Sequence, residues 1–172
     1  RAMTKNASVT LQIARKSEKS GYVTHTVPVE SPHSRVLDAL LHVRHRHDAT
    51  LGFRYSCRVG MCGSCAMVIN GKEGLACQTT VASLGTATIK LEPLRALPAQ
   101  RDLMVDMQPF FRTLVRAEAA LKPREPKRRD VPKLPPQAPH RVTIEGQNGC
   151  ITCGACYSAC EWSSTRPDYL GP

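Results

Sequence analysis

The sequence has few aromatic side chains and no long apolar stretch. Phe, Trp and Tyr make up 5% of its 172 residues, so a small domain would have few bulky core side chains and would gain stability from a prosthetic group. No uninterrupted run of about 18 apolar residues is present, and we therefore expect no membrane-spanning helix. The cysteine-rich segments contain no residue that looks like a catalytic nucleophile or general base. These segments are therefore not expected to make or break bonds by themselves.

Acidic residues are also few: 14 Asp and Glu stand against 24 Lys and Arg, which gives a net charge of +10. A basic excess of this size suggests an anionic partner, such as an acidic protein, a membrane surface or a nucleic acid. Three consecutive basic residues, Lys127, Arg128 and Arg129, lie in a segment with six prolines between residues 123 and 139. Because no aromatic residues are interleaved with these charges, we expect no nucleic acid partner. Docking on an acidic partner, or solubility alone, accounts better for the charge.

The eight cysteines fall into two tight clusters. An even number of cysteines is compatible with a disulfide framework. However, both clusters contain Cys-x2-Cys steps, and no cysteine lies between Cys77 and Cys150. This grouping favours metal ligation in a reducing compartment over disulfides.

The first cluster, between Tyr55 and Cys77, has the spacing C-x4-C-x2-C-x11-C. Its four thiols belong to Cys57, Cys62, Cys65 and Cys77. A C-x4-C-x2-C run closed by a distant fourth cysteine is the plant-type pattern that holds a [2Fe–2S] cluster. The spacing therefore predicts an iron–sulfur site in this stretch.

Other residues of the same stretch suit an anionic cluster. Gly60 and Gly63 have no side chains, so backbone N–H groups can approach the sulfurs. Arg54 and Arg58 bring positive charge close to a centre that carries about two negative charges when four thiolates hold it. Hydrogen bonds and charges of this kind set a reduction potential. We therefore predict a site that moves electrons.

The second cluster has the spacing C-x2-C-x2-C-x3-C, which is the bacterial-ferredoxin run for cubane clusters. Its members are Cys150, Cys153, Cys156 and Cys160. A zinc site more typically has two separated Cys-x2-Cys pairs or includes His, so zinc is the weaker alternative here.

Hydrophobic periodicity predicts a compact β-grasp type of domain in the first part of the chain. Alternation predicts strands at 8–15, 21–29 and 87–91, and a hairpin whose strands, 66–69 and 75–77, are joined by Asn70–Gly71. A helix is predicted to follow Ser34 as its N-cap, and an irregular loop to span residues 51–65. His42, His45 and His47 lie on the polar side at the end of this helix. They could form a metal or proton site, but solvated side chains near a helix C-terminus are the favoured interpretation.

The second part of the chain has a different pattern. Apolar residues recur at helical intervals between 101 and 121, which predicts a helix with a strong apolar face that belongs to the core of a second domain. Residues 122–140 are predicted to form an extended, solvated connection because of their prolines and charges.

The stretch FRYSCRVGMCGSCAMVINGKEGLAC resembles the cluster segment of the iron–sulfur subunit of succinate dehydrogenase and fumarate reductase. The eleven-residue gap before the fourth cysteine is similar to that family's, whereas ordinary plant-type ferredoxins have a much longer one. LEPLRALPAQRDLMVDM resembles the family's link into its helical domain, and CITCGACYSAC its second cysteine run. The resemblance covers about residues 8 to 172.

The resemblance implies an α+β fold, in which an N-terminal β-grasp [2Fe–2S] ferredoxin-like domain, residues 1–100, precedes a helical bacterial-ferredoxin-like dicluster domain, residues 101–172. It implies that Cys57, Cys62, Cys65 and Cys77 hold [2Fe–2S]. It also implies that Cys150, Cys153 and Cys156 bind [4Fe–4S], and that Cys160 serves [3Fe–4S], in line with the rule that the fourth cysteine of such a run serves the other cluster.

The same resemblance implies partners and a location. Electrons would pass between the FAD of a flavoprotein subunit and a membrane quinone, with membrane anchor subunits that carry haem b. The chain would be peripheral on the cytoplasmic face of a bacterial inner membrane, or on the matrix face of the mitochondrial inner membrane. The alternatives are a free-standing ferredoxin-like carrier for another flavoenzyme or dehydrogenase, and a basic zinc protein that binds nucleic acid.

Three features depart from the family pattern. A second downstream cysteine run is missing, Glu161 replaces the proline usual after Cys160, and Ser164 and Thr165 stand where an aromatic pair near the quinone is expected. Trp162 is the candidate left for a quinone contact. Because the sequence begins with Arg1 and ends soon after Cys160, we expect a truncated chain; a variant with altered later clusters is the alternative.

Overall fold

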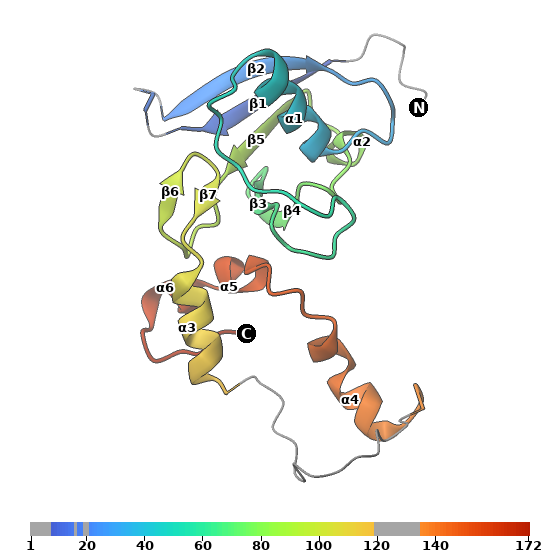
Figure 1. Ribbon diagram of the computed structural model, residues 1–172, viewed down its shortest axis with the longest axis vertical. Coiled ribbons are helices and arrows are strands. Elements are labelled where there is room, and N and C mark those ends of the chain that lie inside the picture. Colours follow the sequence, from blue (N-terminus) through green and yellow to red (C-terminus); the bar gives the residue numbers. More distant parts are fainter. Residues whose placement is uncertain (1–7, 16, 19–20, 119–134) are drawn as a thin grey trace.

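A five-stranded mixed sheet covered by one helix forms the main body of the protein (Figure 1). The computed structural model describes residues 8–15, 17–18, 21–118 and 135–172. The strand order is β2-β1-β5-β3-β4, with β1 parallel to β5 and the other neighbours antiparallel. The strands are β1 Ser8–Ala14, β2 Tyr22–Pro28, β3 Ala66–Ile69, β4 Lys72–Leu75 and β5 Thr88–Glu92. The predicted α+β fold class is confirmed.

The alternation seen in the sequence creates the core. Leu11 and Ile13 of β1 and Ile89 and Leu91 of β5 are fully buried, because strand side chains two residues apart share a face. Helix α1, Val36–Arg46, packs its apolar stripe onto the same core. The Asn70–Gly71 turn is confirmed: both residues have positive φ, 47° and 81°, as a two-residue hairpin turn of this kind needs.

Two predicted boundaries near the first cysteine cluster are wrong. The N-cap of α1 is Arg35, not Ser34, since the Arg35 N–H donates to Asp38 Oδ2 at 2.8 Å while the Ser34 hydroxyl accepts from the Ser31 N–H. The returning strand of the hairpin is Lys72–Leu75, so Cys77 lies in the turn that follows it.

The helix predicted for residues 101–121 is also wrong at its start. A small hairpin, β6 Ala99–Arg101 and β7 Met104–Val105, occupies this stretch, and helix α3 covers only Gln108–Arg116. The Asp106 carboxylate accepts the Gln108 N–H at 2.9 Å, which favours a helix start there. Residues 119–121 lie outside the described part of the chain.

Most of the predicted connection at 122–140 lies outside the described part of the chain, because residues 119–134 are not described. Lys127, Arg128 and Arg129 are among these residues. A short helix, α4 Pro139–Asn148, begins within the last residues of this connection, where an extended chain was predicted. Three further short helices were not predicted: α2 Val81–Leu84, α5 Ala155–Ala159 and α6 Glu161–Thr165. Among the described residues, no helix has the length and apolar character needed to cross a membrane.

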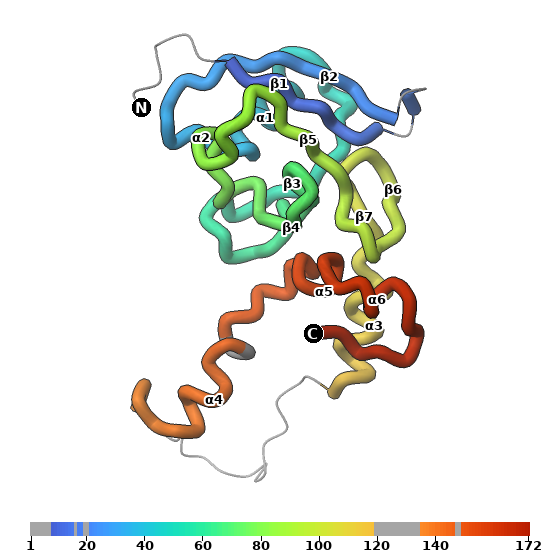
Figure 2. The backbone as a smooth tube through the Cα atoms, turned by 180° about the vertical axis from the view of Figure 1, so that it is seen from behind, coloured from blue at the N-terminus to red at the C-terminus, as the bar shows by residue number. Residues whose placement is uncertain are grey.

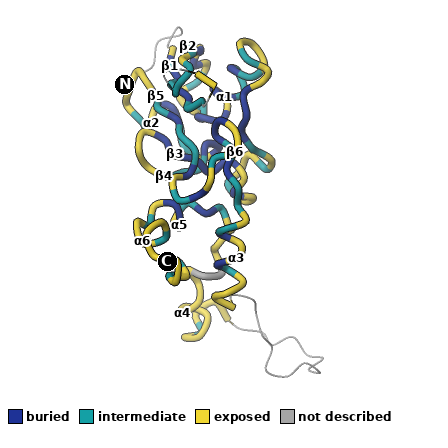
Figure 3. Tube along the Cα trace, turned by 90° about the vertical axis from the view of Figure 1, so that its left-hand side faces the viewer, coloured by how far each residue is buried: buried dark blue, intermediate teal, exposed yellow. Residues whose placement is uncertain are grey.

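The C-terminal helices α5 and α6 lie beside α3 and below β4 (Figure 2). A second core joins α5 and α3 to the sheet domain through Ala66, Leu94, Leu97, Phe110 and Tyr157. Helix α4 is exposed along its length where its side chains are described, whereas α5 contributes buried residues (Figure 3). The second cysteine run is thus carried by a segment that packs on the domain holding the first.

Candidate metal centre

The loop that carries the first cysteines is fixed at its start by buried contacts. The Gly52 N–H donates to Asp102 Oδ2 at 2.7 Å, and the Leu103 N–H donates to the Gly52 carbonyl at 3.1 Å. Phe53 and Tyr55 then stack with ring centroids 5.6 Å apart. These contacts hold residues 52–55 against the β6–β7 hairpin, so the loop enters the cysteine segment from a defined direction.

Two arginines extend that aromatic stack. Arg44 lies over the ring of Phe53 at 5.5 Å, and Arg58 lies over the ring of Tyr55 at 5.4 Å. Arg58 directly follows Cys57 and has a positive φ of 61°, which is strained for a residue with a side chain. The cation–π contact holds its positive charge beside the cysteine loop.

Cys57 and Cys62 form the first pair of thiols. Cys57 Sγ accepts the backbone N–H groups of Met61 and Cys62, both at 3.3 Å, and of Val59 at 3.5 Å. The Cys57 N–H in turn donates to Cys62 Sγ at 3.5 Å. Donors gathered around a sulfur stabilise its charged form, because a thiolate is a better hydrogen-bond acceptor than a thiol.

Cys65 and Cys77 form the second pair and are almost fully buried. The Cys77 N–H donates to Cys65 Sγ at 3.5 Å, and the Gln78 side-chain amide lies 3.8 Å from Cys77 Sγ. Cys65 directly precedes β3, and Cys77 lies in the turn after β4. The hairpin therefore brings together two cysteines that are twelve residues apart.

The two pairs differ in their electrostatics. The Ser64 hydroxyl, with amides of the loop, lowers the pKa of the exposed Cys62 thiol to about 6. Burial raises the pKa of Cys65 to about 11, and the neighbouring Cys77 thiol adds to this rise while the Cys77 N–H opposes it. A buried thiolate at Cys65 thus needs a compensating positive charge, which a bound metal supplies.

The four thiols of the first run lie as two pairs. No group of three or more Cys, His, Asp or Glu side chains in the described residues is arranged to hold a metal ion. The sulfurs lie instead as Cys57 with Cys62 and Cys65 with Cys77. A [2Fe–2S] cluster held by four cysteines has two irons, so a donor set made of two pairs fits it.

The second set of cysteines is more open. Cys150 and Cys156 are exposed and Cys153 and Cys160 are half-buried, and the described thiols of this run form no group that could hold a metal ion as they stand. The backbone N–H of Ser163 is the main cause that lowers the pKa of the Cys160 thiol. The structure therefore pairs Cys57 with Cys62 and Cys65 with Cys77 through N–H···S contacts, and among the described residues it gathers no three thiols of the second run into a metal-binding group.

Trp162, the predicted quinone contact, lies on α6 and is 55% exposed. Its ring makes an edge contact with Tyr169 at 6.1 Å, and the Arg166 guanidinium lies over it at 4.5 Å. Of the three histidines singled out in the sequence, His42 and His47 lie 5.6 Å apart, and His25 of β2 joins them at 5.5 Å from His47. These rings do not form a metal-binding group within the described residues.

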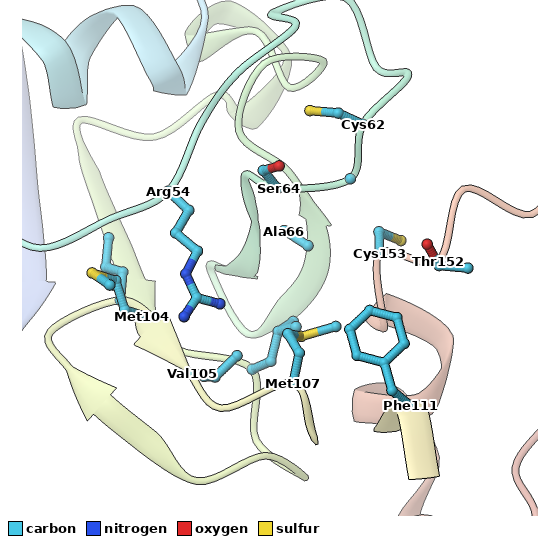
Figure 4. Close-up of a pocket in the computed structure, with 13 residues that line it drawn as sticks. Arg54, Cys62, Ser64, Ala66, Met104, Val105, Met107, Phe111, Thr152 and Cys153 are labelled. Atoms are coloured by element: carbon cyan, nitrogen blue, oxygen red, sulfur yellow. The ribbon is translucent and has the colours of Figure 1, made fainter. Parts of the chain in front are cut away.

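A cavity of about 170 Å³ lies between the two cysteine sets (Figure 4). Arg54 and Cys62 border it from the loop, Met107 and Phe111 from the segment leading into and along α3, and Cys153 from the second run. At its edge, Gly63 and Cys153 are in direct contact, because a Cβ added to Gly63 would lie 2.6 Å from Cys153 Cβ. From the sequence, Gly63 was expected only to let backbone N–H groups approach the sulfurs. Its contact with Cys153 was not predicted, because the linear sequence offers no signal for it.

Residues 8–112 match the family described as 2Fe-2S iron-sulfur cluster binding domain. A fumarate reductase iron–sulfur subunit of Escherichia coli O6:H1 is 32% identical over 99% of this chain and 70% of its own length. The chain therefore belongs to the family of fumarate reductase and succinate dehydrogenase iron–sulfur subunits, and the resemblance drawn from its cysteine segments is confirmed.

Other relatives agree. A fumarate reductase iron–sulfur subunit of Mycobacterium tuberculosis is 39% identical over 80% of this chain. A mitochondrial succinate dehydrogenase iron–sulfur subunit of Oryza sativa is 38% identical over the same share. The chain spans 56% and 49% of their lengths, respectively. The Mycobacterium smegmatis Sdh1 complex shares the fold, with a TM-score of 0.78 at 24% identity, over 96% of this chain and 68% of that one.

Proposed function

We propose that this chain is the electron-transfer subunit of a succinate:quinone or quinol:fumarate oxidoreductase. In this role it relays electrons between the FAD of a flavoprotein subunit and a membrane quinone. Family membership supports the role, and the observation that carries it is the pairing of four cysteines in and beside a loop whose amides point at their sulfurs. A chain with this site holds an electron carrier and needs no catalytic acid or base.

The first cofactor is proposed to be [2Fe–2S], which Cys57, Cys62, Cys65 and Cys77 would hold. When bound, such a centre takes up and releases one electron at a time. The chain's own contribution is to stabilise the thiolates, through the three amides on Cys57 Sγ and the nearby positive charge of Arg58. These groups tune the potential at which the electron is held.

The second run is proposed to serve two further centres. Cys150, Cys153 and Cys156 are assigned to [4Fe–4S], and Cys160 to [3Fe–4S], by the rule for such runs. Neither set is complete in these 172 residues, so the remaining ligands are proposed to lie outside them.

The proposed partners follow from the same role: a flavoprotein subunit, membrane anchor subunits with haem b, and a quinone near Trp162. The net charge of +10 suits a contact with acidic protein or lipid surfaces. The proposed location is the cytoplasmic face of a bacterial inner membrane or the matrix face of the mitochondrial one.

Purification of the intact complex tests this function. We expect the chain to copurify with an FAD-bearing subunit, and the sample to contain iron, acid-labile sulfide and a reduced-state EPR signal of a [2Fe–2S] centre. Iron–sulfur signals without any flavoprotein or membrane partner would favour a free-standing carrier. Zinc without iron would refute the proposal.

A further inference from the structure

Strand β2 lies at the edge of the five-stranded sheet, and no described strand pairs with its outer side (Figure 1). At the opposite edge, β4 is in contact with α5. β2 is seven residues long, pairs with β1 without a bulge, and contains no Lys, Arg, Asp or Glu. Its proline, Pro28, is its last residue. Edge strands are usually blocked by such charges, by bulges or by a cover, so β2 is open to a further strand.

The hydrogen bonds of β1 show to which neighbouring strand each of its residues bonds. The Thr10 N–H donates to the Ala87 carbonyl, on the side of β5, at 2.9 Å. The Arg15 N–H, directly after β1, donates to the Gly21 carbonyl, on the side of β2, at 2.8 Å. Bonding directions alternate along a regular strand. The odd-numbered residues of β1 therefore bond to β2, and the even-numbered ones to β5.

The same alternation determines which backbone groups of β2 point away from the sheet. Leu11 is paired with His25, so the N–H and C=O of His25 face inward to β1. Those of Thr24 and Thr26 face outward, and both threonines are exposed. A strand added at this edge would bond to the backbone of these two residues.

The sequence of β2 is symmetrical about His25. Residues 23–27 read Val-Thr-His-Thr-Val in both directions. In an antiparallel pair of two β2 strands with a two-fold axis at His25, Thr24 lies opposite Thr26 of the second copy, and Val23 lies opposite its Val27. Each pair of threonines can then exchange N–H···O=C bonds through the outward-facing groups. The strand is thus complementary to itself, as a contact between identical surfaces requires.

We propose that β2 is a dimerisation edge, at which two copies of this chain join their sheets through an antiparallel β2–β2 contact with its two-fold axis at His25. The proposal does not depend on the proposed function. The net charge of +10 opposes association of two copies at long range. Salt screens this repulsion, and β2 itself brings no Lys or Arg to the contact.

Charge substitutions at Thr24 and Thr26 test this contact in the full chain. Two like-charged variants, Thr24→Lys/Thr26→Lys and Thr24→Glu/Thr26→Glu, set equal charges opposite each other at both threonine pairs. The matched control is the mixed-charge variant Thr24→Lys/Thr26→Glu, which replaces the same two exposed side chains but sets opposite charges across the axis. Like charges directly opposite destabilise a strand pair, whereas opposite charges stabilise it.

Sedimentation velocity over a range of protein concentrations, at physiological ionic strength, measures the mass of each variant, and circular dichroism checks its fold. We expect the wild type and the mixed-charge variant to form dimers that dissociate on dilution. Each like-charged variant should need about tenfold more protein to dimerise. An equimolar mixture of the two like-charged variants should restore the dimer, with one copy of each, which excludes misfolding as the cause of the loss.

Three results would overturn the proposal. One is a wild type that stays monomeric at every concentration, another is equal dimerisation of the like-charged and mixed-charge variants, and the third is a mixture of like-charged variants that stays monomeric. None of these measurements depends on bound iron or on a flavoprotein, so the proposed function is tested separately.

Discussion

At the scale of single residues, the first site depends on amides aimed at sulfur. Three N–H groups reach Cys57 Sγ because the loop turns through left-handed backbone at Arg58 and Gly60. A non-glycine residue in that conformation costs about 1–2 kcal/mol, and the contact of Arg58 with Tyr55 offsets part of this cost. The strain is therefore best explained by the hydrogen bonds that it makes possible.

Serine substitutions test the assignment of cysteines to separate centres. We expect Cys65→Ser to abolish or strongly alter the EPR signal of the first centre, because a hydroxyl is a poor replacement for a buried thiolate ligand. Cys160→Ser should leave that signal and its iron unchanged, since Cys160 lies in the other run. Loss of the [2Fe–2S] signal in Cys160→Ser would show that the two cysteine sets do not act separately.

His25 makes stability depend on pH. Burial, with His47 and Arg15 nearby, lowers its pKa below the ordinary 6.5, and its Nε2 is buried without a hydrogen-bond partner in the described structure. As the pH falls through 6.5, the unfolded chain binds a proton that the folded chain resists, so stability decreases toward acid pH.

Urea unfolding at about pH 7.5 and about pH 5.5 measures this effect. We expect the free energy of unfolding to fall less on acidification in His25→Gln than in the wild type. In His33→Gln, at an exposed position in the same domain, the free energy of unfolding should fall on acidification as much as in the wild type. An equal fall in His25→Gln would rule out His25 as the source of the pH dependence.

At the scale of elements, the β6–β7 hairpin anchors the cysteine loop through Asp102. This residue is only 8% exposed, turns the chain with a φ of 45°, and accepts the Gly52 N–H at 2.7 Å. Arg15 Nε lies 3.8 Å from its other oxygen. A single carboxylate therefore joins the hairpin to the start of the loop and to the end of β1.

Replacement of Asp102 tests this anchor. We expect Asp102→Ala to lower the free energy of unfolding by about 1–3 kcal/mol, because the buried Gly52 N–H loses its acceptor. Asp102→Asn keeps an oxygen and tolerates the left-handed backbone, so it should cost less. Denaturant unfolding of both variants gives the comparison; equal losses would mean that the charge, not the hydrogen bond to Gly52, is what matters.

Elements with strong local signals were predicted from the sequence, and those set by distant contacts were not. Alternation gave β1, β2 and β5, and Asn70–Gly71 fixed the hairpin, because strand patterns and turn residues are local. Residues 101–107 have helical spacing, but Leu103 is drawn into the main core and bonded to Gly52, so tertiary contacts override the local preference.

The same distinction holds for the candidate site. Spacing predicted all eight cysteines as cluster ligands, since ligand geometry restricts how far apart they lie in the chain, and this assignment stays a prediction. It did not reveal that Gly63 meets Cys153, or that Ser64 acts on Cys62. The first depends on how two distant segments pack, and the second on the direction of one hydroxyl.

At the scale of the whole molecule, Tyr157 is the main apolar link between the second cysteine run and the sheet domain. It is 8% exposed, and its ring meets Phe110 of α3 edge-on at 5.6 Å. We expect Tyr157→Ala to cost about 3 kcal/mol of packing energy, and to release the segment 135–172 while the sheet core stays folded.

Limited proteolysis followed by mass spectrometry measures this release. The expected result is faster cleavage within 135–172 and unchanged protection of the sheet strands. Tyr157→Phe keeps the ring and should restore protection; uniform cleavage of both regions in Tyr157→Ala would instead mean that the two parts unfold as one unit.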